Sequence, residues 1–383
     1  MVTVYNDSLE EVKFKTEEAD IEKCDVTKGG FEHFMRKEIS EEPSVLSKIF
    51  TFYEKSDALP YQDKKRITNS KKISIVGCGT AYHAGLYLCS LLKELTNIPT
   101  ECSVASEFRY SSPNLGGNDT VIFISQSGET ADTLSSLRMA KKAGAYTLGI
   151  VNAVGSSIAT EADAVLYTYA GAEIAVASTK AYCAQCAVGA QLVLLLAEIM
   201  GKEELALQLK TELKRLPELI GRVIDDERRI ALAARELKDA PYAFFIGRQR
   251  DYLAALEGAL KLKEISYIHT ECYPAGELKH GTISLINEGV PVIVLLTDDR
   301  IKDKTFSNLK EVMARGAKAI AFTQEPSEVY KAASVTVEIP KSSAFLTPIV
   351  LATALQLFAY HVAKERGTDI DQPRNLAKSV TVE

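Results

Sequence analysis

The stretch Val121-Ile122-Phe123-Ile124-Ser125-Gln126-Ser127-Gly128-Glu129-Thr130 decides how this chain is interpreted. Its first four residues are apolar, which predicts a short buried strand, and residues 131–143 have the apolar spacing of a helix. Residues 125–130, which we call the anion turn, therefore join a strand to a helix. Backbone amides, a helix N-terminus and hydroxyl groups meet there, and this set of donors suits a bound anion.

The side chains of the anion turn indicate which kind of anion would fit. The alternative is a capped helix start, but a cap needs one hydroxyl, from Ser127 or Thr130, and four side chains here can form hydrogen bonds. The turn has no lysine and no Walker or Rossmann glycine pattern. A compact phosphate monoester is therefore favoured over a nucleotide.

The chain repeats itself at an offset of 170 residues. Residues 77–110 align with residues 247–280 without a gap, and 13 of the 34 positions are identical. One position later in register, residues 121–124 match residues 292–295. Each copy has a β-branched or aromatic run, a glycine turn and a helix that ends near Lys-Glu. Strands that alternate with helices at this spacing predict parallel sheets covered by helices.

The repeat predicts an α/β chain with two tandem three-layer, parallel-sheet domains of flavodoxin-like type that arose by internal duplication. We expect a connector with an N-terminal helix (1–42), a first domain (43–202), a second domain (203–365) and a C-terminal tail (366–383). A helical stretch from about residue 203 to 237 joins the domains, and Pro217 is expected to break or kink it.

The two copies differ at the anion turn. The second copy has Leu296-Thr297-Asp298-Asp299 in its place, and two acidic residues would repel a phosphate. We therefore expect the first copy to bind the anion and the second to supply chemistry or architecture.

Composition excludes several classes of function. The 383 residues carry a net charge of −6 with no basic cluster, which speaks against a nucleic-acid surface. The longest apolar stretch, residues 187–200, is short for a membrane span and contains Gln191 and Glu198. Seven cysteines, several in apolar runs, suit reduced thiols in a cytoplasm, and the Cys183–Cys186 pair has no second pair with which to bind a metal. We expect neither a metal nor a cofactor.

Candidate acid–base residues lie in the second copy. Glu257, Lys261 and Glu264 are spaced four and three residues apart, so they share one face of a helix. Such a triplet is usually a solvated, salt-bridged face, but its neighbours here are apolar and predict burial. Buried carboxylates and lysines need partners, and their proton affinities shift, which is how general bases arise. His280, between charged residues and a glycine in a predicted loop, is a candidate proton shuttle or an ordinary surface histidine.

The tail of the chain is more than a frayed end. Residues 371–380 read Asp-Gln-Pro-Arg-Asn-Leu-Ala-Lys-Ser-Val and follow a predicted helix over residues 348–365. The segment is not of low complexity, and its Arg374 and Lys378 suggest a strand of chain laid into a groove.

Five motifs together resemble the glutamine–fructose-6-phosphate aminotransferase (glucosamine-6-phosphate synthase) family. They are SQSGET at 125–130, VASTK at 176–180, LEGALKLKEISYIH at 256–269, GELKHG at 276–281 and DQPRNLAKSVTVE at 371–383. The resemblance covers the sugar-isomerase (SIS) half from about residue 30, whereas SQSGET alone is shared by the wider superfamily. The family's N-terminal glutaminase domain, whose nucleophile is an N-terminal cysteine, is expected to be missing, because residue 2 is Val2.

The resemblance implies roles for individual residues. Ser125, Gln126, Ser127 and Thr130 would hold the sugar phosphate, and Thr80, Val176 and Ser178 would line the sugar. Glu264 would move a proton between carbon 1 and carbon 2 with help from Lys261. His280 would open the sugar ring from the neighbouring subunit of a homodimer. Lys378 would contact the open-chain sugar and could form a Schiff base with it. Ala81 departs from the serine often found there in the family, so a contact by that hydroxyl is absent.

The implied activity is the synthesis of glucosamine 6-phosphate from fructose 6-phosphate and ammonia, with slow fructose 6-phosphate/glucose 6-phosphate isomerisation when ammonia is absent. Ammonia would come from solution or from a separate glutaminase subunit. Two alternatives remain. One is a deaminase or deglycase of a fructosamine or amino-sugar phosphate, and the other is a sugar-phosphate sensor without catalysis. The presence of Glu264, His280 and Lys378 disfavours the sensor, and the tail disfavours the deaminase.

Overall fold

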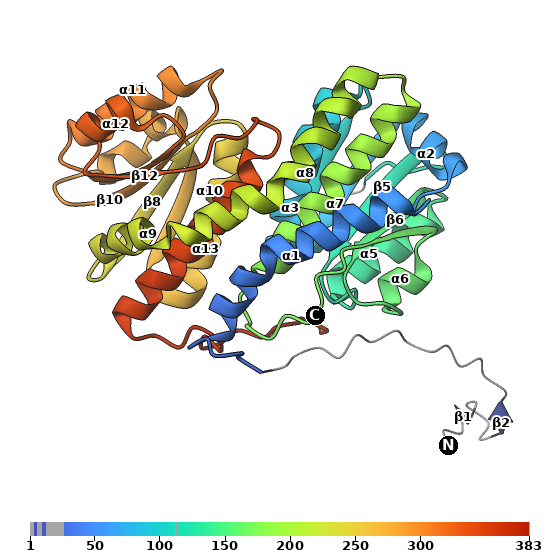
Figure 1. Ribbon diagram of the computed structural model, residues 1–383. Coiled ribbons are helices and arrows are strands. Elements are labelled where there is room, and N and C mark those ends of the chain that lie inside the picture. Colours follow the sequence, from blue (N-terminus) through green and yellow to red (C-terminus); the bar gives the residue numbers. More distant parts are fainter. Residues whose placement is uncertain (1–3, 6–9, 13–26, 112, 383) are drawn as a thin grey trace.

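The computed structural model describes residues 4–5, 10–12, 27–111 and 113–382. Two α/β domains lie side by side, and long helices fill the space between their sheets (Figure 1). Most of residues 1–28, which the sequence analysis assigns to the connector, lies outside the described residues. Within it, β1 (Val4–Tyr5) and β2 (Glu11–Val12) form an antiparallel pair.

The first domain contains a five-stranded sheet in which every neighbouring pair is parallel. Its strands, in the order β4-β3-β5-β6-β7, are β3 (Lys72–Gly77), β4 (Thr100–Val104), β5 (Asp119–Ser125), β6 (Tyr146–Val151) and β7 (Ala164–Tyr167). Strand β5 is buried along nearly its whole length, as expected for the apolar run before the anion turn.

The second domain repeats this topology strand for strand. Its sheet order, β12-β11-β10-β8-β9, is the first order read from the opposite edge. The strands are β8 (Tyr242–Gly247), β9 (His269–Pro274), β10 (Pro291–Leu296), β11 (Lys318–Thr323) and β12 (Val335–Glu338). The sequence repeat is thus a repeat of fold, and the predicted flavodoxin-like order is confirmed.

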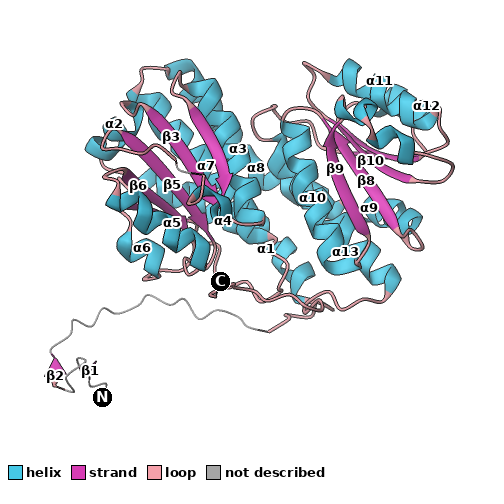
Figure 2. Ribbon diagram, turned by 180° about the vertical axis from the view of Figure 1, so that it is seen from behind, coloured by secondary structure: helices cyan, strands magenta, loops and turns pink. Residues whose placement is uncertain are grey.

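Helices cover both faces of each sheet (Figure 2). In and near the first domain they are α1 (Phe34–Lys55), α2 (Tyr61–Thr68), α3 (Thr80–Leu95), α4 (Ala105–Phe108), α5 (Ala131–Lys142), α6 (Ser157–Glu161) and α7 (Lys180–Ile199). The rest of the chain contributes α8 (Glu203–Asp225), α9 (Glu227–Ala234), α10 (Arg250–Ser266), α11 (Lys302–Met313), α12 (Pro326–Ala332) and α13 (Thr347–Arg366). Helices α3 and α10, which are equivalent in the repeat, pack against each other and join the domains. Residue 42, the predicted end of the connector, lies inside α1.

The predicted break at Pro217 is wrong. Helix α8 continues through Pro217 to Asp225, and the chain breaks at Asp226 instead. Buried leucines on both sides of the proline, among them Leu216 and Leu219, hold the helix against the core. This packing outweighs the one backbone hydrogen bond that a proline removes.

Helix α7 is the apolar centre of the molecule. It is the one helix among the described residues whose length and hydropathy would suffice for a membrane span, and 83% of that segment is buried inside the protein. Both Cys183 and Cys186 are buried within it as free thiols. We read α7 as a core helix, because it packs against α1, α3 and α8 and against β6 of the first sheet.

Candidate active site

The anion turn lies at the topological switch point of the first sheet. Strands β3 and β5 are neighbours, but the chain leaves them toward opposite edges, which opens a crevice at their carboxyl ends. Thr80 begins α3 after β3, and the anion turn follows β5. Ser125 Oγ accepts a hydrogen bond from the Gly128 amide at 3.0 Å and lies 3.3 Å from Thr130 Oγ1. Within the described chain, the amides of Gln126 and Ser127 have no hydrogen-bond partner.

The shape of the turn depends on Gly128. Its φ of +67° is rarely adopted by other residues, and a Cβ there would lie 2.0 Å from Ser156 Oγ. Glu129 points away from the crevice and accepts hydrogen bonds from the Ser157 amide (2.7 Å) and hydroxyl (2.8 Å). Glycine and glutamate in SQSGET therefore have structural roles, which leaves the hydroxyl groups and amides for a ligand.

Lys261 connects the acid–base residues of the second domain to the first domain. Its Nζ lies 2.6 Å from Glu264 Oε2 and 3.3 Å from Glu257 Oε1, and it donates a hydrogen bond to Thr80 Oγ1 at 3.1 Å. The side chain of Lys261 is 1% exposed, whereas that of Glu264 is 20% exposed. The predicted helix face is thus buried at Lys261, and Glu264 is the member that solvent or a substrate can reach.

Glu257 is tied to three partners. Its Oε1 accepts a hydrogen bond from Thr80 Oγ1 (3.0 Å), and its Oε2 lies 2.7 Å from His83 Nδ1. Burial alone would raise the pKa of Glu257, but Lys261 and His83 outweigh it and hold that pKa below its usual value. Burial likewise opposes the charge of Lys261, yet Glu257 and Glu264 keep the pKa of that ammonium above its ordinary range. Lys261 is therefore a fixed positive charge beside Glu264.

The tail lies against the first domain, as predicted. Lys378 Nζ forms an ion pair with the buried Glu173 and donates hydrogen bonds to the Ala175 carbonyl (2.8 Å) and Ser178 Oγ (3.4 Å). Burial opposes the charge of Glu173, but Lys378 and two backbone amides hold the pKa of Glu173 below its usual value. Glu173 also acts electrostatically on Lys261, so the tail lysine and the helix lysine belong to one charge network.

Backbone contacts fix the tail at two further places. The Val176 amide donates to the Asp371 carbonyl at 3.0 Å, and the Ala131 amide donates to the Val380 carbonyl at 3.2 Å. Ser379 Oγ lies 3.2 Å from Ser127 Oγ. The tail therefore reaches the anion turn itself, and it brings Lys378 within one network with Ser178.

His280 stands apart from these groups. It ends a short 3₁₀ helix (Glu277–His280) of the second domain, its side chain is exposed, and it contacts none of the other candidates among the described residues. The structure thus brings Thr80, Lys261 and Glu264 together. It also brings Lys378, Val176 and Ser178 together along the tail, which reaches the anion turn. His280 belongs to neither group.

Sequence reasoning missed two groups in this network. His83 was not recognised because its partner, Glu257, lies 174 residues away in sequence. Glu173 was not recognised because it is a single charged residue in a predicted loop and its partner, Lys378, lies far away in sequence. Its position in the small, apolar stretch Gly-Ala-Glu-Ile-Ala-Val-Ala was the available signal, since a charge in such a stretch needs a partner.

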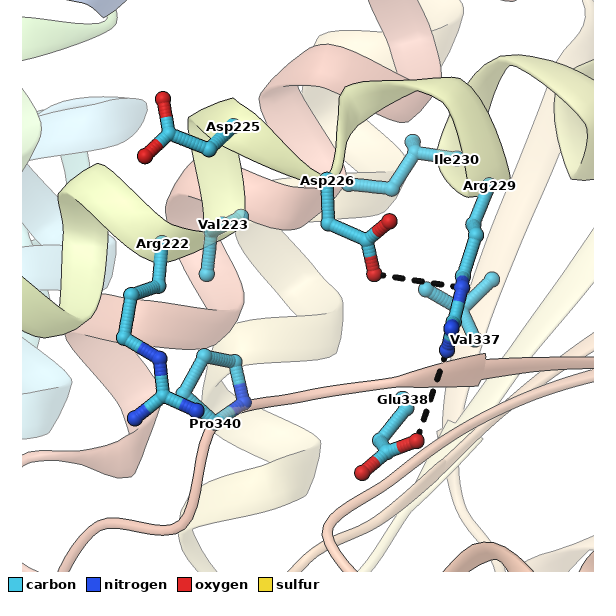
Figure 3. A pocket seen from close by; sticks show the side chains of 9 residues that line it. All are labelled: Arg222, Val223, Asp225, Asp226, Arg229, Ile230, Val337, Glu338 and Pro340. Carbon is cyan, nitrogen blue, oxygen red and sulfur yellow. Dashed lines mark hydrogen bonds and ion pairs between the residues drawn. The ribbon is translucent and has the colours of Figure 1, made fainter.

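A cavity of about 380 Å³ lies elsewhere, where α8 and α9 meet the end of β12 (Figure 3). None of the predicted site residues lines it. Arg229, which points into it, is paired with Asp226 (3.3 Å) and Glu338 (3.4 Å). We assign no function to this cavity.

Comparison with known proteins identifies the class. The SIS domain family matches residues 66–195 and 236–366, one match for each sheet, so the chain belongs to the SIS-domain proteins. The two matches agree with the duplicated fold.

The similar proteins are more specific. The chain is 48% identical over 366 residues to a glutamine–fructose-6-phosphate aminotransferase [isomerizing] of Clostridium tetani. The alignment covers 93% of this chain and 60% of that relative. A solved C-terminal domain of the glucosamine-fructose-6-phosphate aminotransferase of Francisella tularensis matches with a TM-score of 0.85 and 37% identity, over 90% of this chain and all of that one. A glucosamine-6-phosphate deaminase of Thermotoga maritima, at 22% identity and a TM-score of 0.71, shares the fold. The chain thus spans about 60% of the length of its curated relatives and corresponds to their isomerase half.

Proposed function

We propose that this chain binds fructose 6-phosphate and, with ammonia, forms glucosamine 6-phosphate, as the isomerase half of a glutamine–fructose-6-phosphate aminotransferase. The observation that carries the proposal is the contact of Lys261 with both Glu264 and Thr80. It brings an acid–base helix from one domain to the switch-point anion turn of the other. A phosphate held at the turn would place the far end of a sugar near Glu264.

The first step is anchorage. The amides of Gln126 and Ser127 and the hydroxyls of Ser125, Ser127 and Thr130 would receive the phosphate, with the side chain of Gln126 beside them. Binding energy from this non-reacting end would position the reactive carbons. Thr80, Val176 and Ser178 would line the sugar. His280 of a partner subunit in a homodimer would open the ring, which agrees with its exposed position here.

The second step is chemistry at carbons 1 and 2. Lys378, once its ammonium has given up a proton, would attack the carbon 2 carbonyl of the open-chain sugar and form a Schiff base with loss of water. Ammonia would then displace Lys378 and leave nitrogen on carbon 2. Glu264 would take a proton from carbon 1 and return it to carbon 2, while the proton of the carbon 1 hydroxyl passes to the imine nitrogen, which converts the 2-imino ketose skeleton to the 2-amino aldose. The ammonium of Lys261 would stabilise the negative charge that develops on the substrate.

Without ammonia, the same proton transfer on the free ketose would interconvert fructose 6-phosphate and glucose 6-phosphate. No step uses a metal or a cofactor. We further propose a cytoplasmic setting, with ammonia supplied from solution or by a glutaminase partner.

The test is product analysis on the purified chain. Fructose 6-phosphate with an ammonium salt should give glucosamine 6-phosphate, and fructose 6-phosphate alone should give glucose 6-phosphate more slowly. The Glu264→Gln variant should give neither. A chain that binds fructose 6-phosphate but forms no product under either condition would be a sensor, and the proposal would be wrong. Conversion of glucosamine 6-phosphate alone, without formation in the presence of ammonium, would favour the deaminase.

A further inference from the structure

The second domain has its own switch-point crevice, between the carboxyl ends of β8 and β10, and a side chain of the chain itself fills it. Asp251, the second residue of α10, is fully buried there. Its Oδ2 accepts hydrogen bonds from the Thr297 amide at 2.8 Å and the Asp298 amide at 3.3 Å, and its Oδ1 accepts one from the Thr297 hydroxyl.

These amides correspond to the free ones of the first domain. In the register of the repeat, Thr297 and Asp298 match Gln126 and Ser127, and Asp251 matches Ala81. The first copy thus has a methyl group where the second has a carboxylate. The backbone before α3 and α10 is alike, because Gly79 and its counterpart Gln249 share the unusual φ of +52° and +50°. The turns after β5 and β10 differ further on, where Gly128 has a φ of +67° and its counterpart Asp299 has no positive φ. The two sites therefore share the helix start and the pair of turn amides.

The acidic residues emphasised by the sequence are not what closes the second crevice. Asp298 turns to Arg300, with distances of 2.9 and 2.7 Å to its Nε and Nη2, so its charge is balanced locally. Burial raises the pKa of Asp251 to about 6, although the hydrogen bonds from Thr297 lower it. At neutral pH this side chain is therefore mostly a charged carboxylate. Glu94, which holds in the first copy the position that Glu264 holds in the second, is also engaged, because it forms an ion pair with Arg250.

We propose that the second domain retains the frame of an anion site and that the Asp251 carboxylate occupies it in place of an external phosphate. The residue at positions 81 and 251 then decides which copy accepts a phosphate, so one chain holds one sugar phosphate. The inference rests on the proposed function for the first copy and adds a site, latent in the second, for a small tetrahedral anion.

The test is rescue of a missing carboxylate by inorganic phosphate. Asp251→Ala empties the crevice and frees its amides, whereas the control Asp251→Asn keeps it filled. Melting temperatures of the parent and both variants are compared in phosphate and in chloride at equal ionic strength. The rise in melting temperature that phosphate causes in all three proteins reports phosphate binding at the anion turn of the first domain. Asp251→Ala should gain about 2–4 °C beyond that common value.

The outcomes separate the two ideas. If phosphate raises the melting temperature of none of the three proteins, the first-domain turn is not a phosphate site. If it raises all three equally, with no excess in Asp251→Ala, the proposed latent site is wrong. If Asp251→Ala does not fold, the reciprocal change decides. Ala81→Asp should abolish the common gain, and Ala81→Ser, which adds a small side chain without a charge, should keep most of it. Retention of the full phosphate response by a folded Ala81→Asp variant would overturn the proposal.

Discussion

Lys261 Nζ lies 2.6 Å from Glu264 Oε2 and hydrogen bonds to Thr80 of the other domain, so the acid–base pair is joined to the start of α3, which follows the strand next to β5. In the first copy, the position of Lys261 is taken by Leu91 and that of Glu264 by Glu94. The second copy therefore carries both the paired lysine and glutamate and the site filled by Asp251, whereas the first copy keeps the free anion turn.

The anchor can be tested by removing hydroxyl groups. Ser127→Ala combined with Thr130→Ala should weaken fructose 6-phosphate binding by more than two decades, because each hydrogen bond to a charged group is worth ~1.5–3 kcal/mol. Calorimetry measures the affinity. Thr211→Ala, which removes an exposed hydroxyl from α8, is the control and should bind like the parent. Equal affinity in the double variant and the control would remove the anion turn from the site.

Gly128 offers a test of the turn's shape. Alanine there meets a strained φ of +67° and a contact at 2.0 Å, so Gly128→Ala should cost ~2–4 kcal/mol of unfolding free energy and weaken phosphate binding. Gly155→Ala is matched, since its φ is +74° but no atom lies within 4 Å of the added Cβ. Strain alone should cost that control ~1–2 kcal/mol. Denaturant unfolding compares them, and equal losses would show that the contact with Ser156 is unimportant.

Glu42 on α1 should make stability depend on pH. It is fully buried, and burial raises its pKa to about 8, against a hydrogen bond from Thr353. Between about pH 4.5 and 8 the folded chain therefore binds the proton more tightly than the unfolded chain, so stability falls as pH rises through this window. Glu42→Gln should resemble the parent near pH 5 and be more stable by roughly 1–4 kcal/mol at pH 8 and above. The exposed Glu204→Gln is the control, and parallel pH profiles of Glu42→Gln and the parent would contradict the assignment.

His280 can be assigned to a subunit by mixing two inactive variants. In a homodimer with shared sites, a hybrid of Glu264→Gln and His280→Ala has one site with both lesions and one with neither. Part of the activity should then return, up to about a quarter of the parent value for random exchange. Absence of recovery after proven subunit exchange would place His280 in the site of its own chain.

The sequence predicted the repeated parallel sheets and the proximity of Lys261 to Glu264 because both depend on local patterns. Apolar runs define β5 and β10, and helical spacing places Lys261 next to Glu264. The contacts it could not supply join residues far apart in sequence, such as His83 with Glu257 or Lys378 with Glu173. Pro217 shows the converse, since a strong local rule gave way to the packing of α8 against the core.

The central claim, that Glu264 is the base, is tested most directly by deuterium exchange at carbon 1 of fructose 6-phosphate in heavy water. A general base contributes about 10²–10⁴-fold, so Glu264→Gln should slow exchange by at least that order with binding little changed. Glu94→Gln alters the same residue in the other copy, where it pairs with Arg250, and should exchange at nearly the parent rate once its fold is verified. Exchange at the parent rate in Glu264→Gln, together with its loss in Glu94→Gln, would show that the chemistry belongs to the other copy.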